Sequence, residues 1–258
     1  MLSDITPLVL TLNEEANIGR TLASLSWATD VVIVDSGSSD RTTEIARSFA
    51  NVRVVQRPFT THAEQWNFGL NETGIKTEWV LALDADFLLS DAVVAELRAL
   101  SPGDTAGFTA TFVYCVNGAP LRSGVYPPVT VLYRRASARY EQDGHTQRVA
   151  INGRVERLRQ PILHDDRKPL GHWLQSQVRY MRLEADKLTS APASALSGAD
   201  RVRQWIAVAP LAVFCYCLFV RGGILDGWRG WWYATQRMVA EAILSMLLIE
   251  RRLAPPDR

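Results

Sequence analysis

Two aspartates, Asp84 and Asp86, stand directly after the strongly apolar run 79–83. Residues two positions apart leave the end of a strand on the same side, so both carboxylates can share one hard divalent cation through oxygen ligands. Such a cation would bridge a diphosphate. An acidic loop without a ligand is the alternative for an isolated Asp-x-Asp pair, so the neighbouring motifs decide between the two interpretations.

Two upstream loops also carry polar side chains directly after apolar runs. Thr11, Asn13 and Glu14 follow the run that begins at residue 5, and Asp35 ends the run 31–35. In an open α/β sheet, ligands bind beyond the carboxyl ends of the strands, so the three loops are expected to converge on one edge. Asp35 can accept a hydrogen bond from a nucleobase N–H at that edge. The sequence contains no glycine-rich phosphate fingerprint of the dinucleotide-binding or P-loop type.

The first hundred residues alternate short apolar runs with amphipathic stretches, which predicts βα units around a largely parallel sheet. We expect strands over 5–12, 31–35, 52–56 and 79–83, and helices over 14–27, 41–50, 63–73 and 91–100. Asn13, Asp40 and Ser90 stand where a helix needs an N-cap, and each side chain can accept from a first-turn N–H. From residue 107 onward, β-branched and aromatic residues broken by turns favour an antiparallel or mixed extension of the sheet. A further helix is expected over 170–188, followed by a small-residue linker.

The C-terminal part is rich in apolar residues, tryptophan and arginine. The uncharged run 205–220 is shorter than the roughly 20 residues of a membrane-spanning helix, and it contains Pro210. Four of the eight tryptophans fall in this tail near several arginines, a composition typical of bilayer interfaces. Further along, Arg237, Glu241 and Ser245 recur every four positions and form one polar stripe on an otherwise apolar helix. The alternatives are ordinary buried helices and an in-plane membrane association, of which we favour the second.

Charge is divided unevenly along the chain, although the formal net charge is only +1. Residues 1–131 contain 8 Lys and Arg against 15 Asp and Glu, and the remainder contains 20 against 12. A hydrophobic fraction of 47% is enough for a sizeable core and excludes intrinsic disorder. Cys115, Cys215 and Cys217 have neither the number of a disulfide framework nor the spacing of a zinc site. The N-terminus lacks the basic start of a secretory signal, so we expect the protein on the cytosolic side.

Four motifs in a fixed order resemble those of the inverting family 2 glycosyltransferases, whose fold is GT-A. They are TLNEEANI (11–18), VDSGSSDRT (34–42), AEQWNFG (63–69) and LALDADF (81–87). The later pieces PILHDD, YMRLEADK and GGILDGWRGWWYATQ are similar to the branch that contains lipopolysaccharide-core β-1,4-glucosyltransferases. The resemblance covers nearly the whole chain. It implies an α/β fold with a mixed, mainly parallel, Rossmann-like sheet flanked by helices, and a C-terminal helical membrane-associating extension.

The same resemblance divides the chain and implies roles for individual residues. Residues 1–130 would bind the nucleotide sugar, 131–195 would form the acceptor and catalytic half, and 196–258 would be the membrane-associating tail. The nucleotide-sugar pocket would be formed by Thr11, Asn13, Glu14, Asp35, Asn67 and Asp84, with Asp35 near the base and Asp84 near the ribose or the metal. Asp86 would bind the cofactor, Mn²⁺ or Mg²⁺, and His164 is a further candidate ligand. Because Trp66 stands where relatives often carry Arg or Lys, Arg134 or Arg135 is expected to hold the diphosphate.

Inversion needs one more carboxylate, a general base that takes the acceptor hydroxyl proton as this oxygen attacks the anomeric carbon. The segment RYEQDGHTQ offers Glu141 and Asp143. Asp143 is favoured because the glycine after it permits a tight turn into the site, and Glu141 is the alternative. His145 is a candidate for a metal or phosphate contact, and a structural role is equally compatible with the sequence.

Together the residues and the resemblance predict a metal-dependent inverting transferase. It would move a sugar from a nucleotide sugar, expected to be a UDP-sugar, to a membrane glycolipid or lipopolysaccharide-core acceptor. We expect it at an anionic membrane surface, on the cytoplasmic face of the inner membrane, as a peripheral or monotopic protein. A non-catalytic membrane-associated scaffold and a nucleotidyltransferase are the alternatives. The N-terminal half is acidic and lacks a concentrated basic patch, which argues against nucleic acid as a partner.

Overall fold

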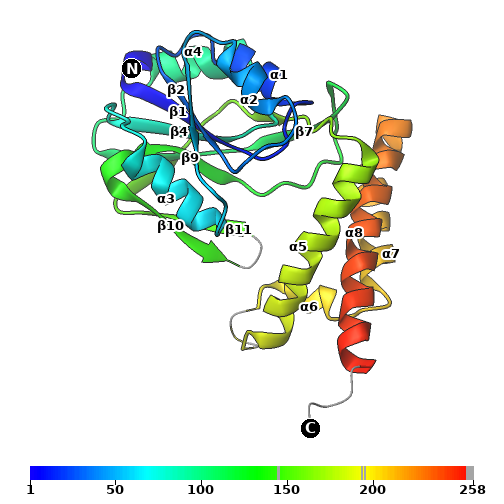
Figure 1. Cartoon of the computed structure of the whole chain (residues 1–258). Helices are drawn as coiled ribbons and strands as arrows, with labels where there is room; N and C mark the ends of the chain where they lie inside the picture. Colours follow the sequence, from blue (N-terminus) through cyan, green and yellow to red (C-terminus); the bar gives the residue numbers. More distant parts are fainter. Residues whose placement is uncertain (144–145, 193, 195, 254–258) are drawn as a thin grey trace. The chain divides into compact units, whose positions relative to one another are not determined.

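The computed structural model describes the chain except for residues 144–145, 193, 195 and 254–258 (Figure 1). The chain divides into two compact units. The first comprises Met1–Pro120 and Tyr126–Lys168 and is called the sheet unit. The second comprises Leu121–Val125 and Pro169–Arg258 and is called the helical unit.

A seven-stranded mixed sheet forms the centre of the sheet unit, with the strand order β12-β6-β9-β4-β1-β2-β3. The strands are β1 (Ile5–Thr11), β2 (Val31–Asp35), β3 (Val52–Gln56), β4 (Trp79–Asp84), β6 (Thr105–Ala110), β9 (Val129–Arg134) and β12 (Arg154–Arg157). Strands β1 to β4 pair in parallel, whereas β9 runs antiparallel to both β4 and β6. The predicted sheet, mainly parallel with an antiparallel extension, is confirmed.

Each of the first four strands is followed by a helix. These are α1 (Ile18–Ala23), α2 (Thr42–Arg47), α3 (His62–Glu72) and α4 (Asp91–Ala99). Ser90 caps α4, because its Oγ accepts from the Val93 N–H at 3.4 Å, as predicted. The predictions for Asn13 and Asp40 are wrong, since α1 begins after Asn17 and α2 after Arg41. Asn13 and Asp40 instead lie in loops that bind each other.

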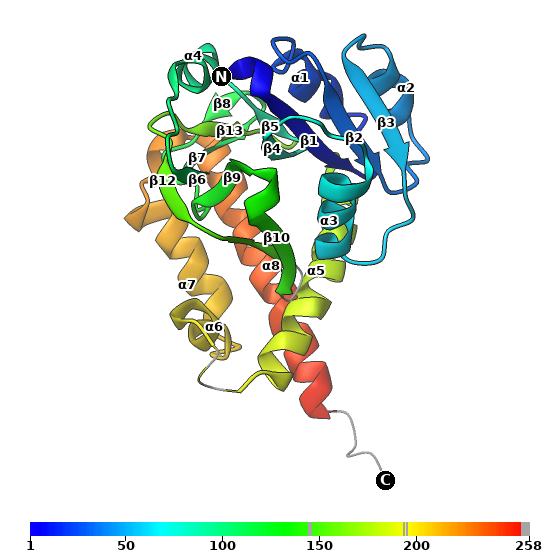
Figure 2. The same ribbon diagram turned by 90° about the vertical axis from the view of Figure 1, so that its left-hand side faces the viewer.

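The strands β1, β2 and β4 of the central sheet are buried on both faces, because successive residues along them are buried and mostly apolar, whereas all residues of the edge strand β12 are exposed. Side chains of a strand alternate between the two faces, so neighbouring residues belong to different cores. On one face, Val9 and Ile33 pack with apolar side chains of α1, α2 and α4. On the other face, Leu8 and Val34 pack with α3 and the strand that follows β9 (Figures 1 and 2). This layering fixes the carboxyl ends of β1, β2 and β4 side by side.

Smaller β structures complete the sheet unit. A four-stranded sheet has the order β5-β13-β7-β8, with β5 (Phe87–Leu88), β7 (Phe112–Val116), β8 (Ala119–Pro120) and β13 (Ile162–His164). The strands β10 (Ala138–Asp143) and β11 (Thr146–Ile151) form an antiparallel hairpin. In the small sheet, His164 at the end of β13 lies opposite Phe87 at the start of β5.

The helical unit consists of α5 (Leu170–Ser190), α6 (Gly198–Arg203), α7 (Ala209–Cys215), the π-helical segment η4 (Tyr216–Val220), the short η5 (Gly223–Asp226) and α8 (Trp228–Leu253). The helix predicted over 170–188 is confirmed. Met181 and Leu188 of α5 pack with Leu244 and Leu248 of α8, which groups α5 with the tail helices and not with residues 131–168. Within the described residues, no helix combines the length and the apolar character that crossing a bilayer requires.

Candidate active site

Two loops at the carboxyl edge of the central sheet are joined by hydrogen bonds. Asn13 N–H donates to Ser38 Oγ and Ser39 N–H donates to Asn13 Oδ1, both at 2.9 Å. Asn13 has a φ of 56°, in the left-handed region that Asn adopts more readily than most residues. Glu14 N–H donates to Thr42 Oγ1 at 2.7 Å. The loop after β1 is therefore held against the loop after β2.

Asp35, the last residue of β2, is fully buried and organises the second of these loops. Thr11 Oγ1 donates to its Oδ2 at 2.8 Å, and Ser38 Oγ donates to the same oxygen at 2.5 Å. The backbone N–H groups of Gly37 and Ser38 donate to Oδ1. A buried carboxylate is tolerated where donors surround it, as they do here. The predicted nucleobase contact of Asp35 stays a prediction, and the structure adds a loop-shaping role for Thr11 and Asp35.

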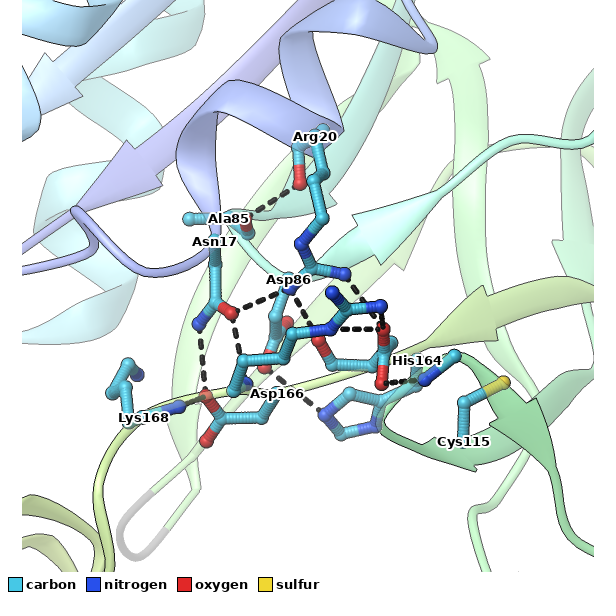
Figure 3. Close-up of polar contacts among 12 residues, drawn as sticks. Asn17, Arg20, Ala85, Asp86, Cys115, His164, Asp166 and Lys168 are labelled. Atoms are coloured by element: carbon cyan, nitrogen blue, oxygen red, sulfur yellow. Dashed lines mark hydrogen bonds and ion pairs between the residues drawn. The ribbon is translucent and has the colours of Figure 1, made fainter.

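The two aspartates of the third loop lie beside a histidine from a distant part of the chain. Asp84 ends β4, and Asp86 follows two residues later. His164 Nε2 lies 3.1 Å from Asp86 Oδ2, and Figure 3 shows the imidazole ring directed at this carboxylate. The other sides of the ring are packed by Phe87, Tyr114 and Tyr126. An aromatic wall thus keeps His164 against the Asp-x-Asp loop.

Burial and charge act differently on the two aspartates. Burial, together with the nearby charge of Asp86, raises the pKa of Asp84 to about 6. Burial also opposes ionisation of Asp86, but attraction and a hydrogen bond from His164 hold its pKa below the usual value. In return, Asp86 raises the pKa of His164 in spite of the burial of the ring. The site therefore favours the charged form of Asp86, whereas nearby positive groups compensate little of the negative charge that Asp84 would carry.

The donor set fits a hard divalent cation that takes further ligands from a substrate. Asp86 Oδ1 is buried and has no hydrogen-bond partner among the described residues. Mg²⁺ and similar cations bind to one or two carboxylates and complete their shell with phosphate oxygens and water. In the part of the chain that the structure describes, no three His, Cys, Asp or Glu residues are placed to hold a metal by themselves. Asp84 and Asp86 are consequently the residues that would hold the cation, with His164 supporting Asp86.

The loop after β13 carries four consecutive charged residues, and the first of them, Asp165, connects the elements around this site. Asp165 is fully buried, and its N–H donates to the backbone oxygen of Asp86 at 3.0 Å. Its carboxylate accepts from Arg20 of α1 at 2.7 Å, and also from Arg167 and the Gly118 N–H. These bonds tie the Asp-x-Asp loop, the start of α1 and the end of β13 to one another.

Lys168 places a positive charge beside the same loops. Its Nζ lies 2.7 Å from Glu14 Oε1, and Asn17 Nδ2 donates to Glu14. Asn17 Nδ2 also donates to Asp166, a contact drawn in Figure 3. Burial raises the pKa of Glu14 to about 7, although Lys168 opposes this shift, and Asp86 adds to it. Burial lowers the pKa of Lys168, but Glu14, Asp166 and Asp86 together raise it above its usual value. Lys168 is thus a charged amine within the field of the candidate metal ligands.

Comparison with known proteins agrees with this arrangement. The model of the family described as glycosyl transferase family 2 matches residues 8–149, which include all three carboxyl-edge loops and most of the β10–β11 hairpin. The chain belongs to this family.

Individual relatives of this family 2 glycosyltransferase support the same conclusion. The lipopolysaccharide core biosynthesis glycosyltransferase LpsC of Rhizobium meliloti is 29% identical over 198 residues, which cover 71% of each chain. An uncharacterized glycosyltransferase of Rickettsia bellii is 37% identical over 95 residues, which span 36% of this chain and only 31% of that protein. The structure of S. aureus TarS 1-349 in complex with UDP-GlcNAc has a TM-score of 0.52 at 15% identity, over 96% of this chain and 91% of that one. At this identity the structural likeness shows the fold alone, and it confirms the predicted fold class.

The prediction that Arg134 or Arg135 holds the diphosphate is wrong for this glycosyltransferase. Arg134 pairs with Trp79 at the opposite end of β4 from Asp84. The strand rises by about 3.3 Å per residue, so the two ends lie about 16 Å apart. Arg134 instead forms an ion pair with Glu78 and covers the ring of Trp79, while the Arg135 N–H donates to the Glu78 backbone. The antiparallel direction of β9 carries both arginines away from the site.

Asn67 and the candidate bases of the glycosyltransferase belong to α3 and the neighbouring hairpin. Asn67 Nδ2 donates to Tyr140 O and Asn67 Oδ1 accepts from Tyr140 N–H, both at 2.9 Å. Its amide thus positions β10, which carries Glu141 and Asp143. Glu141 is exposed. The side chain of Asp143 and the whole of His145 lie outside the described residues, so their predicted roles stay predictions.

Asn17, Arg20, Asp165 and Lys168 have no predicted role in the sequence, although the structure places them around the site. Their partners are far apart in the chain, as in the pair Arg20–Asp165, so no spacing pattern connects them. The available signal was the short apolar strand β13 followed by four consecutive charged residues. Like the Asp-x-Asp motif, this is a charged cluster directly after a strand.

Proposed function

We propose that this family 2 glycosyltransferase transfers a sugar from a UDP-sugar to a lipopolysaccharide-core-type acceptor on a membrane glycolipid, with Mn²⁺ or Mg²⁺ as cofactor. The observation that carries the proposal is the Asp84–Asp86 pair. Among the described residues the buried Asp86 Oδ1 has no hydrogen-bond partner, and burial together with the charge of Asp86 raises the pKa of Asp84 to about 6. A divalent cation would satisfy both carboxylates and attract a diphosphate.

The chain's own residues would divide the work of the reaction. A bound divalent cation supplies neutralisation of the negative charge that develops on the departing nucleoside diphosphate. Asp84 and Asp86 would hold it, and His164 favours the ionised form of Asp86. Lys168 is the cation we assign to the diphosphate, because its charge acts on both aspartates and Arg134 is too distant.

The acceptor side would be served by the β10–β11 hairpin. The base, Asp143 or alternatively Glu141, takes the proton of the acceptor hydroxyl while that oxygen attacks the anomeric carbon from the face opposite the diphosphate. The C–O bond to the diphosphate breaks as the new glycosidic bond forms, so the configuration inverts. Support for a lipopolysaccharide-core acceptor comes from the R. meliloti relative LpsC, a lipopolysaccharide core biosynthesis glycosyltransferase. Such an acceptor would place the enzyme at the cytoplasmic face of the inner membrane.

The test uses the purified full chain, a panel of UDP-sugars and a lipid extract, and it measures released nucleoside diphosphate. We expect turnover with Mn²⁺ or Mg²⁺ and none in excess chelator. Asp86→Asn should reduce kcat by about 100-fold or more, since charge stabilisation at a leaving diphosphate is worth several kcal/mol.

A matched control is Asp104→Asn, which makes the same change at a side chain that is 85% exposed and should leave kcat unchanged. Full turnover of Asp86→Asn in excess chelator would overturn the metal-dependent mechanism. If the panel is extended to other nucleotide sugars and none is turned over, the result would favour the alternative of a non-catalytic member of the family.

A further inference from the structure

The longest helix of the helical unit exposes its apolar side. Trp228 is 88% exposed and Met246 is 70% exposed. They are 18 residues apart, which is five full turns of an α-helix, so they lie on the same line along α8. Trp232 and Leu253 lie close to this line and are also exposed. The outward side of α8 thus carries apolar side chains from its first turn to its last, with Thr235 and Glu250 as exposed polar residues near the same line.

The polar stripe of α8 faces inward. Glu241 and Ser245 are only 5% and 9% exposed. Arg203 of α6 lies 3.1 Å from Glu241 Oε1, and Ser245 Oγ donates to the Ile206 backbone at 2.7 Å. Hydrophobic burial in water would favour the opposite orientation, with the polar side outward. Burial of an ion pair also costs desolvation energy. The buried Arg203–Glu241 pair therefore gives no reason for the tryptophan rings of α8 to be exposed.

The helix packed against α8 continues the apolar surface. The ring of Phe214 in α7 lies 5.8 Å from that of Trp231 in α8. Leu211 in α7 and Phe219 in η4 are each about 60% exposed, and Leu225 of η5 is 70% exposed. We call the exposed apolar side chains between residues 205 and 253 the apolar face. Exposed apolar surfaces of this extent mark contacts with a partner or a membrane.

The charges around this face indicate which partner it fits. Between residues 201 and 253, the exposed charged side chains are Arg201, Arg221, Arg229, Arg252 and Glu250. A second copy of the chain would bring the same positive charges together. An anionic bilayer would attract them, and tryptophan rings are favoured at the level of lipid head groups.

We propose that the apolar face lies in the interfacial layer of an anionic phospholipid bilayer, with α8 parallel to the membrane plane. Helices bound in this way bury their apolar side by about 5–10 Å at the boundary between head groups and acyl chains. The inward polar stripe then holds the helical unit together while its outer side chains contact lipid. This inference goes beyond sugar transfer, and it does not depend on the metal or the donor.

The test measures cosedimentation of the full chain with phosphatidylcholine vesicles that contain phosphatidylglycerol, and with phosphatidylcholine vesicles alone. We expect binding to the anionic vesicles, weaker binding to the neutral ones, and about tenfold weaker binding of the Trp228→Glu/Met246→Glu variant. Val155→Glu changes an exposed apolar residue of the sheet unit in the same way and should bind as the wild type does. Release of nucleoside diphosphate from a soluble donor, measured without vesicles, should be unchanged in both variants.

A second measurement does not depend on the folding of the variants. Brominated phosphatidylcholine in the anionic vesicles should quench tryptophan fluorescence of the wild-type chain. No quenching and no cosedimentation at low salt would overturn the proposal. A second result would also overturn the proposal: the chain forms a dimer in buffer, fails to bind vesicles, and becomes a monomer in Trp228→Glu/Met246→Glu. The apolar face would then be covered by a second copy of the chain.

Discussion

Asp86 remains charged in a buried loop because His164 lies against it, and the surrounding charges are arranged around this pair. Asp84 has no comparable partner, and its pKa rises to about 6. Glu14 is paired with Lys168, yet burial still raises its pKa to about 7. At the scale of single residues, the site therefore has an excess of carboxylates, whose negative charge a divalent cation would neutralise.

Replacing Lys168 tests its assignment to the diphosphate. Lys168→Met removes the amine that pairs with Glu14 and lies within the electrostatic field of Asp86. The KM for the donor should therefore rise by about tenfold or more. Lys76→Met changes an exposed lysine of the sheet unit and should leave this KM unaltered. An unchanged donor KM in Lys168→Met, measured by diphosphate release over a range of donor concentrations, would contradict the assignment.

Glu14 should make stability depend on pH in a defined direction. Its pKa in the folded chain, about 7, lies above the ordinary value of 4.5, so the folded state holds the proton more tightly than the unfolded state. This contribution is complete below pH 4.5 and is lost as the pH rises towards 7. Between about pH 5 and 8, the wild type should therefore lose about 1–2 kcal/mol more of its free energy of unfolding than Glu14→Gln does. Urea unfolding of both proteins at the two pH values measures the difference, and equal losses would contradict it.

At the scale of elements, the site is built from strand ends and the loops that leave them. β1, β2 and β4 bring three loops to one edge, and β13 enters from the small sheet to add His164 and Asp165. The hairpin that carries the candidate bases is positioned differently. It depends on α3, where both ends of the Asn67 amide bond to the Tyr140 backbone.

The position of the hairpin can be tested without touching the candidate bases. Asn67→Ala removes both hydrogen bonds to Tyr140, so β10 should shift relative to α3 and kcat should fall by about tenfold, with little change in donor KM. Asn71→Ala removes an exposed amide one turn later and should preserve kcat. Assaying Glu141→Gln and Asp143→Asn alongside identifies the base, because a near wild-type rate of Asp143→Asn would exclude that residue. A rise in donor KM without loss of kcat in Asn67→Ala would instead assign Asn67 to the donor.

At the scale of the whole molecule, charge follows the division into units. The sheet unit contains 16 Lys and Arg against 20 Asp and Glu, and the helical unit contains 12 against 7. The acidic unit holds the carboxylates that we assign to a divalent cation. The basic unit carries the apolar face that we assign to an anionic bilayer, so the uneven distribution seen in the sequence matches the two different partners that we propose.

Much of the sheet unit could be predicted because its signals are local. Strands β2 and β3 have the predicted bounds, and Ser90 caps α4 as expected, since alternation and capping involve residues only a few positions apart. The start of α1 was predicted four residues too early. Residues 13–17 form long-range bonds to the next loop, such as that between Glu14 N–H and Thr42, and no propensity encodes them.

The sequence by itself determined the family, the α/β sheet and the aspartate pair that begins at the end of β4, because a contiguous motif encodes each of these. Only the tertiary structure decided which charges meet. It brought His164 to Asp86, Asp165 to Arg20 and Lys168 to Glu14, and it moved Arg134 to the far end of β4. The physical reason is that sequence spacing fixes the side of a strand or helix on which a residue lies, whereas packing between distant elements fixes its partner. For the same reason, the polar stripe of α8 was visible in the sequence, but only packing against its neighbours turned it inward.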